Sequence, residues 1–146
     1  MTEEQVTKII INWLKSNSWK IICFDFPQSG TGKMIHPNNH ENEKNSGTFI
    51  PDIVAVRNDT AVFFENKDRF FFQDYLKVNH LINSSDYSDD IKSLLADYSI
   101  VNIYYGIGLP IEKHKKKSQD SQNLVDFIIG VSNNSVNIIY QKNSIF

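Results

Sequence analysis

Residues 49–68, which read FIPDIVAVRNDTAVFFENKD, combine two apolar stretches with charged residues near their ends. The stretches flank Asn58 and Asp59, a pair that tolerates the left-handed backbone of a tight hairpin turn. We therefore predict two antiparallel strands, 49–57 and 60–67. Apolar residues occupy both faces of each strand, which indicates a hairpin that is covered on both sides in the interior of a sheet.

The predicted hairpin brings three charged residues together. If Asn58 and Asp59 alone form the turn, Asp52 lies directly opposite Glu65, with Cβ atoms about 4.5–5.5 Å apart. Lys67 lies two residues beyond Glu65 and therefore shares its face of the sheet. Facing carboxylates raise each other's pKa unless a cation lies between them, and carboxylate oxygens suit Mg²⁺. The adjacent ammonium could stabilise charge that develops on phosphorus, so the cluster indicates metal-dependent phosphodiester hydrolysis. The alternative is a purely structural cluster in which Lys67 neutralises one carboxylate.

Periodicity on either side of the hairpin predicts the remaining elements. Thr2 and Gln5 form a capping-box pattern at the start of a helix over 3–16, and a strand follows over 19–26. Residues 28–48 lack periodicity and predict a long loop. Further helices are expected at 71–83 and 89–98, a strand at 99–106, a polar connection at 110–123, and a terminal hairpin from 124–131 and 136–140. We expect a single domain over 1–146 of mixed α/β (α+β) class, with one mixed sheet flanked by helices.

Pro51-Asp52 and Glu65-Asn66-Lys67 resemble the two halves of the motif of the PD-(D/E)XK nuclease superfamily. That superfamily has a restriction endonuclease-like αβββαβ core with the motif on its second and third strands, and the resemblance covers roughly residues 3–106. It implies that Asp52 and Glu65 bind Mg²⁺, or Mn²⁺ in its place, with help from the backbone carbonyl of Asn66. It also implies that Lys67 orients or activates the attacking water. Glu3 is the candidate for a further acid from the first helix, although a first-turn acid is also favoured by the helix dipole alone.

Five residues are candidates for nucleic-acid contacts; a flexible loop is the favoured alternative for Lys33, a solvated helix face is favoured for Gln73 and Lys77, and a solvated loop is as typical as a DNA contact for Lys115 and Lys116. Lys33 ends SGTGK, which lacks the residues of a Walker phosphate loop. Gln73 and Lys77 lie on the helix after the motif, and Lys115 and Lys116 lie in EKHKKK. The formal net charge of −2 argues against a protein that coats nucleic acid without specificity, but it allows a local basic surface.

These features predict a Mg²⁺-dependent DNA endonuclease of restriction or other defence type, which acts on duplex or branched DNA. One site per chain and a two-stranded substrate favour a homodimer. The alternatives are a Holliday junction resolvase-like nuclease, and a non-catalytic nucleic-acid-binding or interaction module on a nuclease-like scaffold. No apolar run approaches the roughly 20 residues of a membrane span and no signal-peptide pattern is present, so we expect a cytoplasmic protein without a membrane partner.

Overall fold

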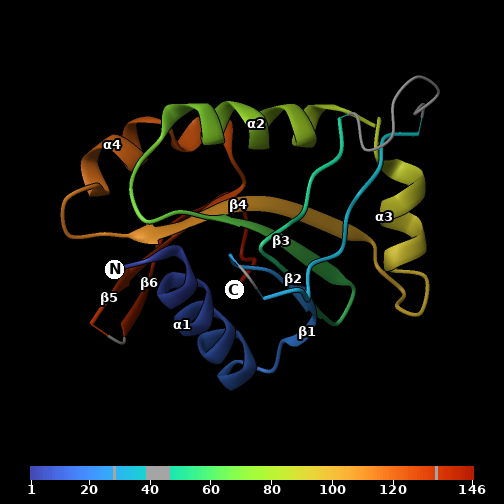
Figure 1. Ribbon diagram of the computed structural model, residues 1–146, viewed down its shortest axis with the longest axis horizontal. Helices are drawn as coiled ribbons and strands as arrows, with labels where there is room; N and C mark the ends of the chain where they lie inside the picture. Colours follow the sequence, from blue (N-terminus) through green and yellow to red (C-terminus); the bar gives the residue numbers. More distant parts are fainter. Residues whose placement is uncertain (28, 39–46, 134) are drawn as a thin grey trace.

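Six strands form one mixed sheet in the sequential order β1-β2-β3-β4-β5-β6, with helices on both faces (Figure 1). The computed structural model describes residues 1–27, 29–38, 47–133 and 135–146. Part of the predicted loop 28–48 therefore lies outside the described residues. The elements are α1 (Glu3–Ser16), β1 (Lys20–Phe24), β2 (Ile53–Arg57), β3 (Thr60–Asn66), α2 (Phe72–Asn83), α3 (Ser88–Leu94), β4 (Asn102–Pro110), α4 (Lys115–Asp120), the 3₁₀ helix η1 (Gln122–Leu124), β5 (Phe127–Ser132) and β6 (Ser135–Gln141). This confirms the predicted mixed α/β class.

The central hairpin has the predicted two-residue turn and buries both of its faces. Arg57 pairs with Thr60 and Ile53 with Phe64, and Asn58 has a left-handed φ of 55°. One face of the hairpin packs with α1 in a core that includes Ile53, Ala55, Val62 and Phe64. The opposite face, which includes Val54, Val56, Ala61 and Phe63, packs with α3. Strand alternation alone assigns these residues to the correct faces.

The helices complete three layers, with α1 on one face of the sheet and α2 and α3 on the other (Figure 1). The predicted capping box is present: the Thr2 N–H donates to Gln5 Oε1 over 2.8 Å, and the Gln5 N–H donates to Thr2 Oγ1 over 3.2 Å. These bonds satisfy donors that the first turn of a helix leaves free. They define where α1 begins, and hence where Glu3 lies.

The predicted strand 49–57 is too long at its N-terminal end. Phe49 forms an isolated bridge with Ile35, and β2 begins only at Ile53. In a regular ladder the next hydrogen-bonded pair beyond Ile53–Phe64 would join Pro51 to Asn66, but proline has no N–H to donate. The Asp52 N–H instead donates to the Phe64 carbonyl over 2.9 Å. The paired register therefore stops before Asp52 and Glu65, and the expectation that they face each other directly in the ladder is wrong.

The strand predicted at 99–106 is displaced along the chain. β4 spans Asn102–Pro110 and runs parallel to both β3 and β5. Gly106 and Gly108 lie inside the strand, and a Cβ at either position would collide with neighbouring atoms. α3 also ends earlier than predicted, at Leu94.

The predicted polar connection 110–123 contains α4 and most of η1. The hydroxyl of Tyr75 on α2 donates to Ser118 Oγ on α4 over 2.9 Å, and both side chains are buried. The short lysine-rich helix is thereby held against α2. The predicted terminal hairpin is present, with β5 and β6 antiparallel and Ser132 paired with Ser135, but its first strand begins at Phe127 and not at residue 124.

Candidate active site

The backbone around Asp52 is held by both neighbouring strands. Its N–H donates to the Phe64 carbonyl, and its carbonyl accepts the Asp25 N–H, each over 2.9 Å. The carboxylate accepts a hydrogen bond of 2.6 Å from the Asn66 N–H to Oδ2. Asp52 therefore lies where β2 and β3 begin to separate, with its side chain bound to the residue between Glu65 and Lys67.

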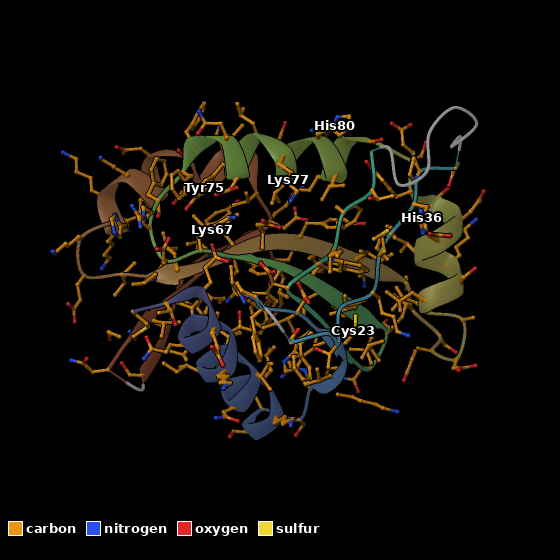
Figure 2. All side chains as sticks on the ribbon, viewed as in Figure 1. Cys23, His36, Lys67, Tyr75, Lys77 and His80 are labelled. Atoms are coloured by element: carbon orange, nitrogen blue, oxygen red, sulfur yellow. The ribbon has the colours of Figure 1, made fainter. Side chains whose placement is uncertain are left out.

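Lys67 lies between the N-terminal ends of α1 and α2 (Figure 2). Its N–H donates to the Gly108 carbonyl over 2.9 Å, which extends the pairing of β3 with β4 by one residue. Its Nζ lies 3.7 Å from Glu3 Oε1, 3.7 Å from Glu65 Oε1 and 4.0 Å from Asp74 Oδ1. One ammonium thus contacts acids from α1, β3 and α2.

Glu65 contacts a second cation on α2. Lys77 Nζ lies 3.2 Å from Glu65 Oε2, so this lysine, which the sequence suggested as a nucleic-acid contact, forms an ion pair inside the acidic cluster. In Figure 2 the Lys77 side chain extends from α2 toward the sheet. The cluster comprises four acids and two lysines: Glu3, Asp52, Glu65, Asp74, Lys67 and Lys77.

Asp52 has a raised pKa, unlike a surface acid that a nearby cation neutralises. Burial and the nearby charge of Glu65 raise the pKa of Asp52 to about 8, against the opposing effect of the Asn66 hydrogen bond. Among the described residues no cation forms an ion pair with Asp52. An additional positive charge at this carboxylate would therefore be strongly favourable.

The surrounding acids stabilise the charged form of Lys67. Burial lowers the pKa of Lys67, but Asp74, Glu65, Glu3 and Asp52 together outweigh burial and raise it above its ordinary value. Burial also raises the pKa of Asp74, although Lys67 opposes the shift. Lys67 is therefore a stable cation at neutral pH, suited to donating hydrogen bonds and unsuited to accepting a proton.

The donor set fits Mg²⁺. Among the described residues no three His, Cys, Asp or Glu side chains are arranged to hold a metal ion by themselves. Mg²⁺ commonly uses only one or two protein carboxylates and retains several waters. Asp52 and Glu65 are two carboxylates of the kind that could bind such an ion, and the raised pKa of Asp52 marks the place where a cation would relieve electrostatic repulsion. The role of the Asn66 carbonyl in this site stays a prediction.

The structure distinguishes the two acids of the first helical turn. Glu3 contacts Lys67, whereas Glu4 pairs with Lys8 on the same helix, with 2.7 Å between Lys8 Nζ and Glu4 Oε1. Glu3, the candidate acid of the first helix, therefore lies at the cluster.

The other candidates for nucleic-acid contacts lie on separate surfaces. Gln73 is exposed on the first turn of α2, beside Asp74. Lys115 and Lys116 are exposed on α4, which the Tyr75–Ser118 hydrogen bond holds against α2. Lys33 lies beside Cys23 on the edge strand β1, where its charge affects the ionisation of that thiol.

Asp74 shares the helix after the motif with Gln73 and Lys77, and the sequence does not show which of these polar residues lies near the site. Asp74 occupies the first turn of α2, and its Oδ2 is buried with no hydrogen-bond partner among the described residues. The apolar pattern of α2 shows which face packs on the sheet, but it does not show that the first turn of α2 reaches Lys67. Only the placement of α2 beside the end of β3 reveals this contact.

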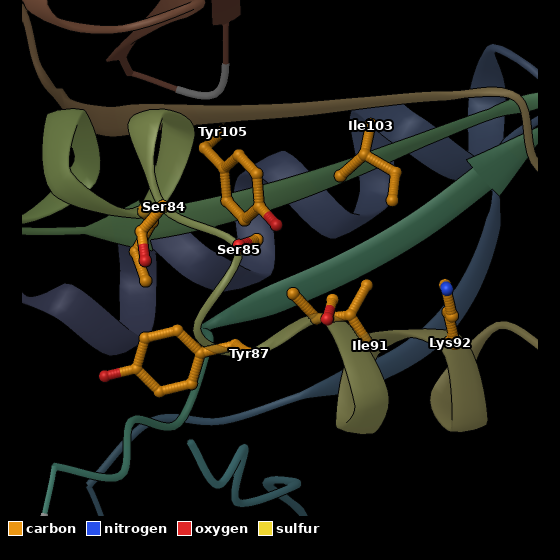
Figure 3. Close-up of a pocket in the computed structure, with 9 residues that line it drawn as sticks. Ser84, Ser85, Tyr87, Ile91, Lys92, Ile103 and Tyr105 are labelled. Carbon is orange, nitrogen blue, oxygen red and sulfur yellow. The ribbon is translucent and has the colours of Figure 1, made fainter. Parts of the chain in front are cut away.

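A separate pocket of about 250 Å³ lies toward the C-terminal end of α2 (Figure 3). Residues of α2, α3 and β4, including Leu81, Ile91, Ile103 and Tyr105, line it. None of the six cluster residues contributes to its wall, so the pocket is distinct from the candidate active site.

Comparisons with protein-family models, with curated proteins and with solved structures give no significant match. The functional assignment therefore depends on the residues of this chain. Within the described residues no helix has both the length and the apolar character needed to cross a membrane.

Proposed function

We propose that the chain is a Mg²⁺-dependent DNA endonuclease of the PD-(D/E)XK type, which hydrolyses phosphodiester bonds. The observation that supports this most strongly is the acidic cluster at the end of the central hairpin. Asp52 there is a partly buried carboxylate with a pKa of about 8 and no ion-pair partner among the described residues, and Glu65 and Lys67 lie next to it.

The purely structural interpretation of the cluster is less favoured. It requires Lys67 to neutralise the neighbouring carboxylates of Asp52 and Glu65 and hold their pKa values low. Lys67 Nζ instead contacts Glu3, Glu65 and Asp74. Its charge lowers the pKa of Asp52 by less than burial or the charge of Glu65 raises it. A carboxylate without a cation partner destabilises the native state, and a neutral residue at position 52 would avoid this cost. Stability of the fold alone therefore does not explain Asp52.

Each residue then has a distinct role. Asp52 and Glu65, with the Asn66 carbonyl, would hold Mg²⁺, and Mn²⁺ could replace it. When bound at these residues, Mg²⁺ would supply a positive charge that makes water more acidic and neutralises the phosphate. Lys67 is protonated and therefore donates hydrogen bonds, which orient the attacking water or stabilise the charge on the phosphoryl oxygens. Glu3 adds negative charge from α1.

Exposed lysines on α4 favour a nucleic-acid substrate. Lys115 and Lys116 are exposed on α4, and the contact between Ser118 and Tyr75 places α4 beside α2, the helix that also carries Asp74. We propose double-stranded DNA as the substrate, a cytoplasmic restriction or defence role, and a homodimer that places one site on each strand. Sedimentation equilibrium with and without duplex DNA tests the assembly, and a monomer under both conditions would rule out the dimer.

The experiment that tests the activity uses supercoiled plasmid, relaxed duplex, four-way junction and RNA, each with Mg²⁺ and with chelator. The proposal predicts Mg²⁺-dependent cleavage of plasmid and duplex. Cleavage confined to the junction would indicate a resolvase. Binding without cleavage of any substrate would indicate a non-catalytic nucleic-acid-binding module.

A further inference from the structure

Asn66 has an unusual environment for the residue between Glu65 and Lys67. Its side chain points to the face of β3 opposite Glu65 and is 1% exposed, as is Thr7 on α1. The Asn66 Nδ2 donates to Thr7 Oγ1 over 3.0 Å, a buried hydrogen bond between residues that are 59 positions apart in the chain.

The amide of Asn66 is tightly enclosed. A Cβ at Gly108 would collide with Asn66 Oδ1 and with Ile10 on α1, so only glycine leaves room for the amide. Asn66 Oδ1 nevertheless has no hydrogen-bond partner among the described residues. A buried amide with an unsatisfied oxygen is costly, and an apolar side chain of similar size would fill the same space without that cost. The stability of the core therefore does not account for this residue.

Thr7 lies one helical turn after Glu3, so the two side chains share a face of α1. Glu3 contacts Lys67, and Thr7 contacts Asn66, the residue before Lys67. The last residue of β3 and the residue after it thus contact consecutive turns of α1. The Glu3–Lys67 ion pair joins partly exposed side chains 3.7 Å apart, a type of contact that is too weak to fix a geometry alone.

We infer that the buried hydrogen bond between Thr7 and Asn66 positions Glu3 against Lys67 and so makes Glu3 the third acid of the site. Thr7 and Asn66 are positioning residues, because they act through Glu3 and Lys67. The significance of this geometry for metal binding rests on the proposed function, whereas the geometry itself is independent of it.

Zero-length carbodiimide coupling in metal-free protein tests the geometry directly. The reagent joins a carboxylate and an amine that are in contact, and digestion followed by mass spectrometry separates the Lys67–Glu3 amide from the Lys67–Asp74 amide. Asp74 belongs to α2 and serves as an internal control. Thr7→Val, which keeps the shape and removes the hydroxyl, should lower the ratio of the first product to the second several-fold. Thr7→Ser, which keeps the hydroxyl, should retain the wild-type ratio.

Thr7→Ala is the second variant, because its smaller side chain leaves space for a water to reach the Asn66 amide. An unchanged ratio in Thr7→Val and Thr7→Ala would overturn the inference. Failure of both variants to fold would also overturn it, since the bond would then serve the fold and not the placement of Glu3.

Mg²⁺ titration calorimetry then connects the geometry to the site. Thr7→Val and Glu3→Gln should each weaken Mg²⁺ binding by about tenfold, and the double variant should bind no more weakly than Glu3→Gln alone. Additive losses would overturn the inference. If the wild-type protein bound no Mg²⁺, the proposed function would fail, while the coupling ratio would still decide whether Thr7 and Asn66 position Glu3.

Discussion

The main-chain N–H of Asn66 donates to Asp52 Oδ2 over 2.6 Å, which joins the end of one strand of the hairpin to the residue between Glu65 and Lys67 on the other. In a regular ladder this N–H would donate to the carbonyl of Pro51. The carboxylate takes the place of that carbonyl at the point where the strands separate. The residues of the candidate site are therefore fixed by backbone hydrogen bonding as well as by side-chain contacts.

The raised pKa of Asp52 predicts how stability depends on pH in metal-free protein. The native state holds this proton up to about pH 8, whereas the unfolded chain releases it near its ordinary pKa of about 3.9. The contribution of this group is therefore fully present below about pH 4 and is lost as the pH rises toward about 8. Asp52→Asn should be more stable than the wild type by roughly 1–3 kcal/mol at about pH 9, and the difference should shrink at about pH 5.

Urea unfolding with chelator at both pH values measures this effect. Asp97→Asn, which alters an exposed acid outside the cluster, is the matched control and should change stability little at either pH. If Asp52→Asn were less stable than the wild type at the higher pH, Asp52 would have a neutralising partner in the native protein, and the metal site would lose its main support.

Bound Mg²⁺ should raise the melting temperature of the wild-type protein, because a ligand that binds only the native state stabilises it. At a concentration about 100 times Kd the gain is about 2.7 kcal/mol. Glu65→Gln removes one of the two anionic ligands and should lose most of the shift. Differential scanning fluorimetry across a Mg²⁺ series measures it, with Glu4→Gln as the control because Glu4 pairs with Lys8 away from the cluster. An equal shift in Glu65→Gln and the wild type would exclude Glu65 as a ligand.

The lysines of α4 should contribute to DNA binding through phosphate contacts. Replacing both Lys115 and Lys116 with Ala should weaken duplex binding and lower the slope of log affinity against log salt by up to about 2. Fluorescence anisotropy in Ca²⁺ at several salt concentrations measures both quantities. Lys92→Ala on α3 is the control, since Lys92 lines the separate pocket near the other end of α2. An unchanged slope in the double variant would show that Lys115 and Lys116 do not contact the DNA phosphates.

The sequence predicted the central hairpin well because its signals are local. A two-residue turn determines the register of the strands it joins, and alternation then assigns Val54 and Phe63 to one face and Ile53 and Phe64 to the other. The errors arise where tertiary contacts override local signals. Pro51 interrupts the first strand, and the glycines of β4 are required by packing against Asn66 and Phe127, not by a turn.

The acids of the cluster differ in the same way. Asp52 and Glu65 follow from the hairpin, and Glu3 follows from its place on the apolar stripe of α1. The sequence does not separate Asp74 from Gln73 and Lys77, because its contact with Lys67 depends on how α2 lies relative to the end of β3. The hydrogen bond between Thr7 and Asn66 joins residues far apart in the chain, and no periodic pattern in the sequence indicates it.

The central claim is that Lys67 serves the chemistry of phosphodiester hydrolysis, and plasmid cleavage by Lys67→Ala in Mg²⁺ tests it most directly. Lys77→Ala is the matched control, because Lys77 pairs with the same Glu65 at 3.2 Å. Lys67→Ala should lose about 10²–10³-fold in cleavage rate, as expected when one group that stabilises the transition state is removed, with Mg²⁺ binding and folding retained. Lys77→Ala should keep most of its activity. Cleavage by Lys67→Ala at the wild-type rate, or a loss explained entirely by unfolding, would contradict the account.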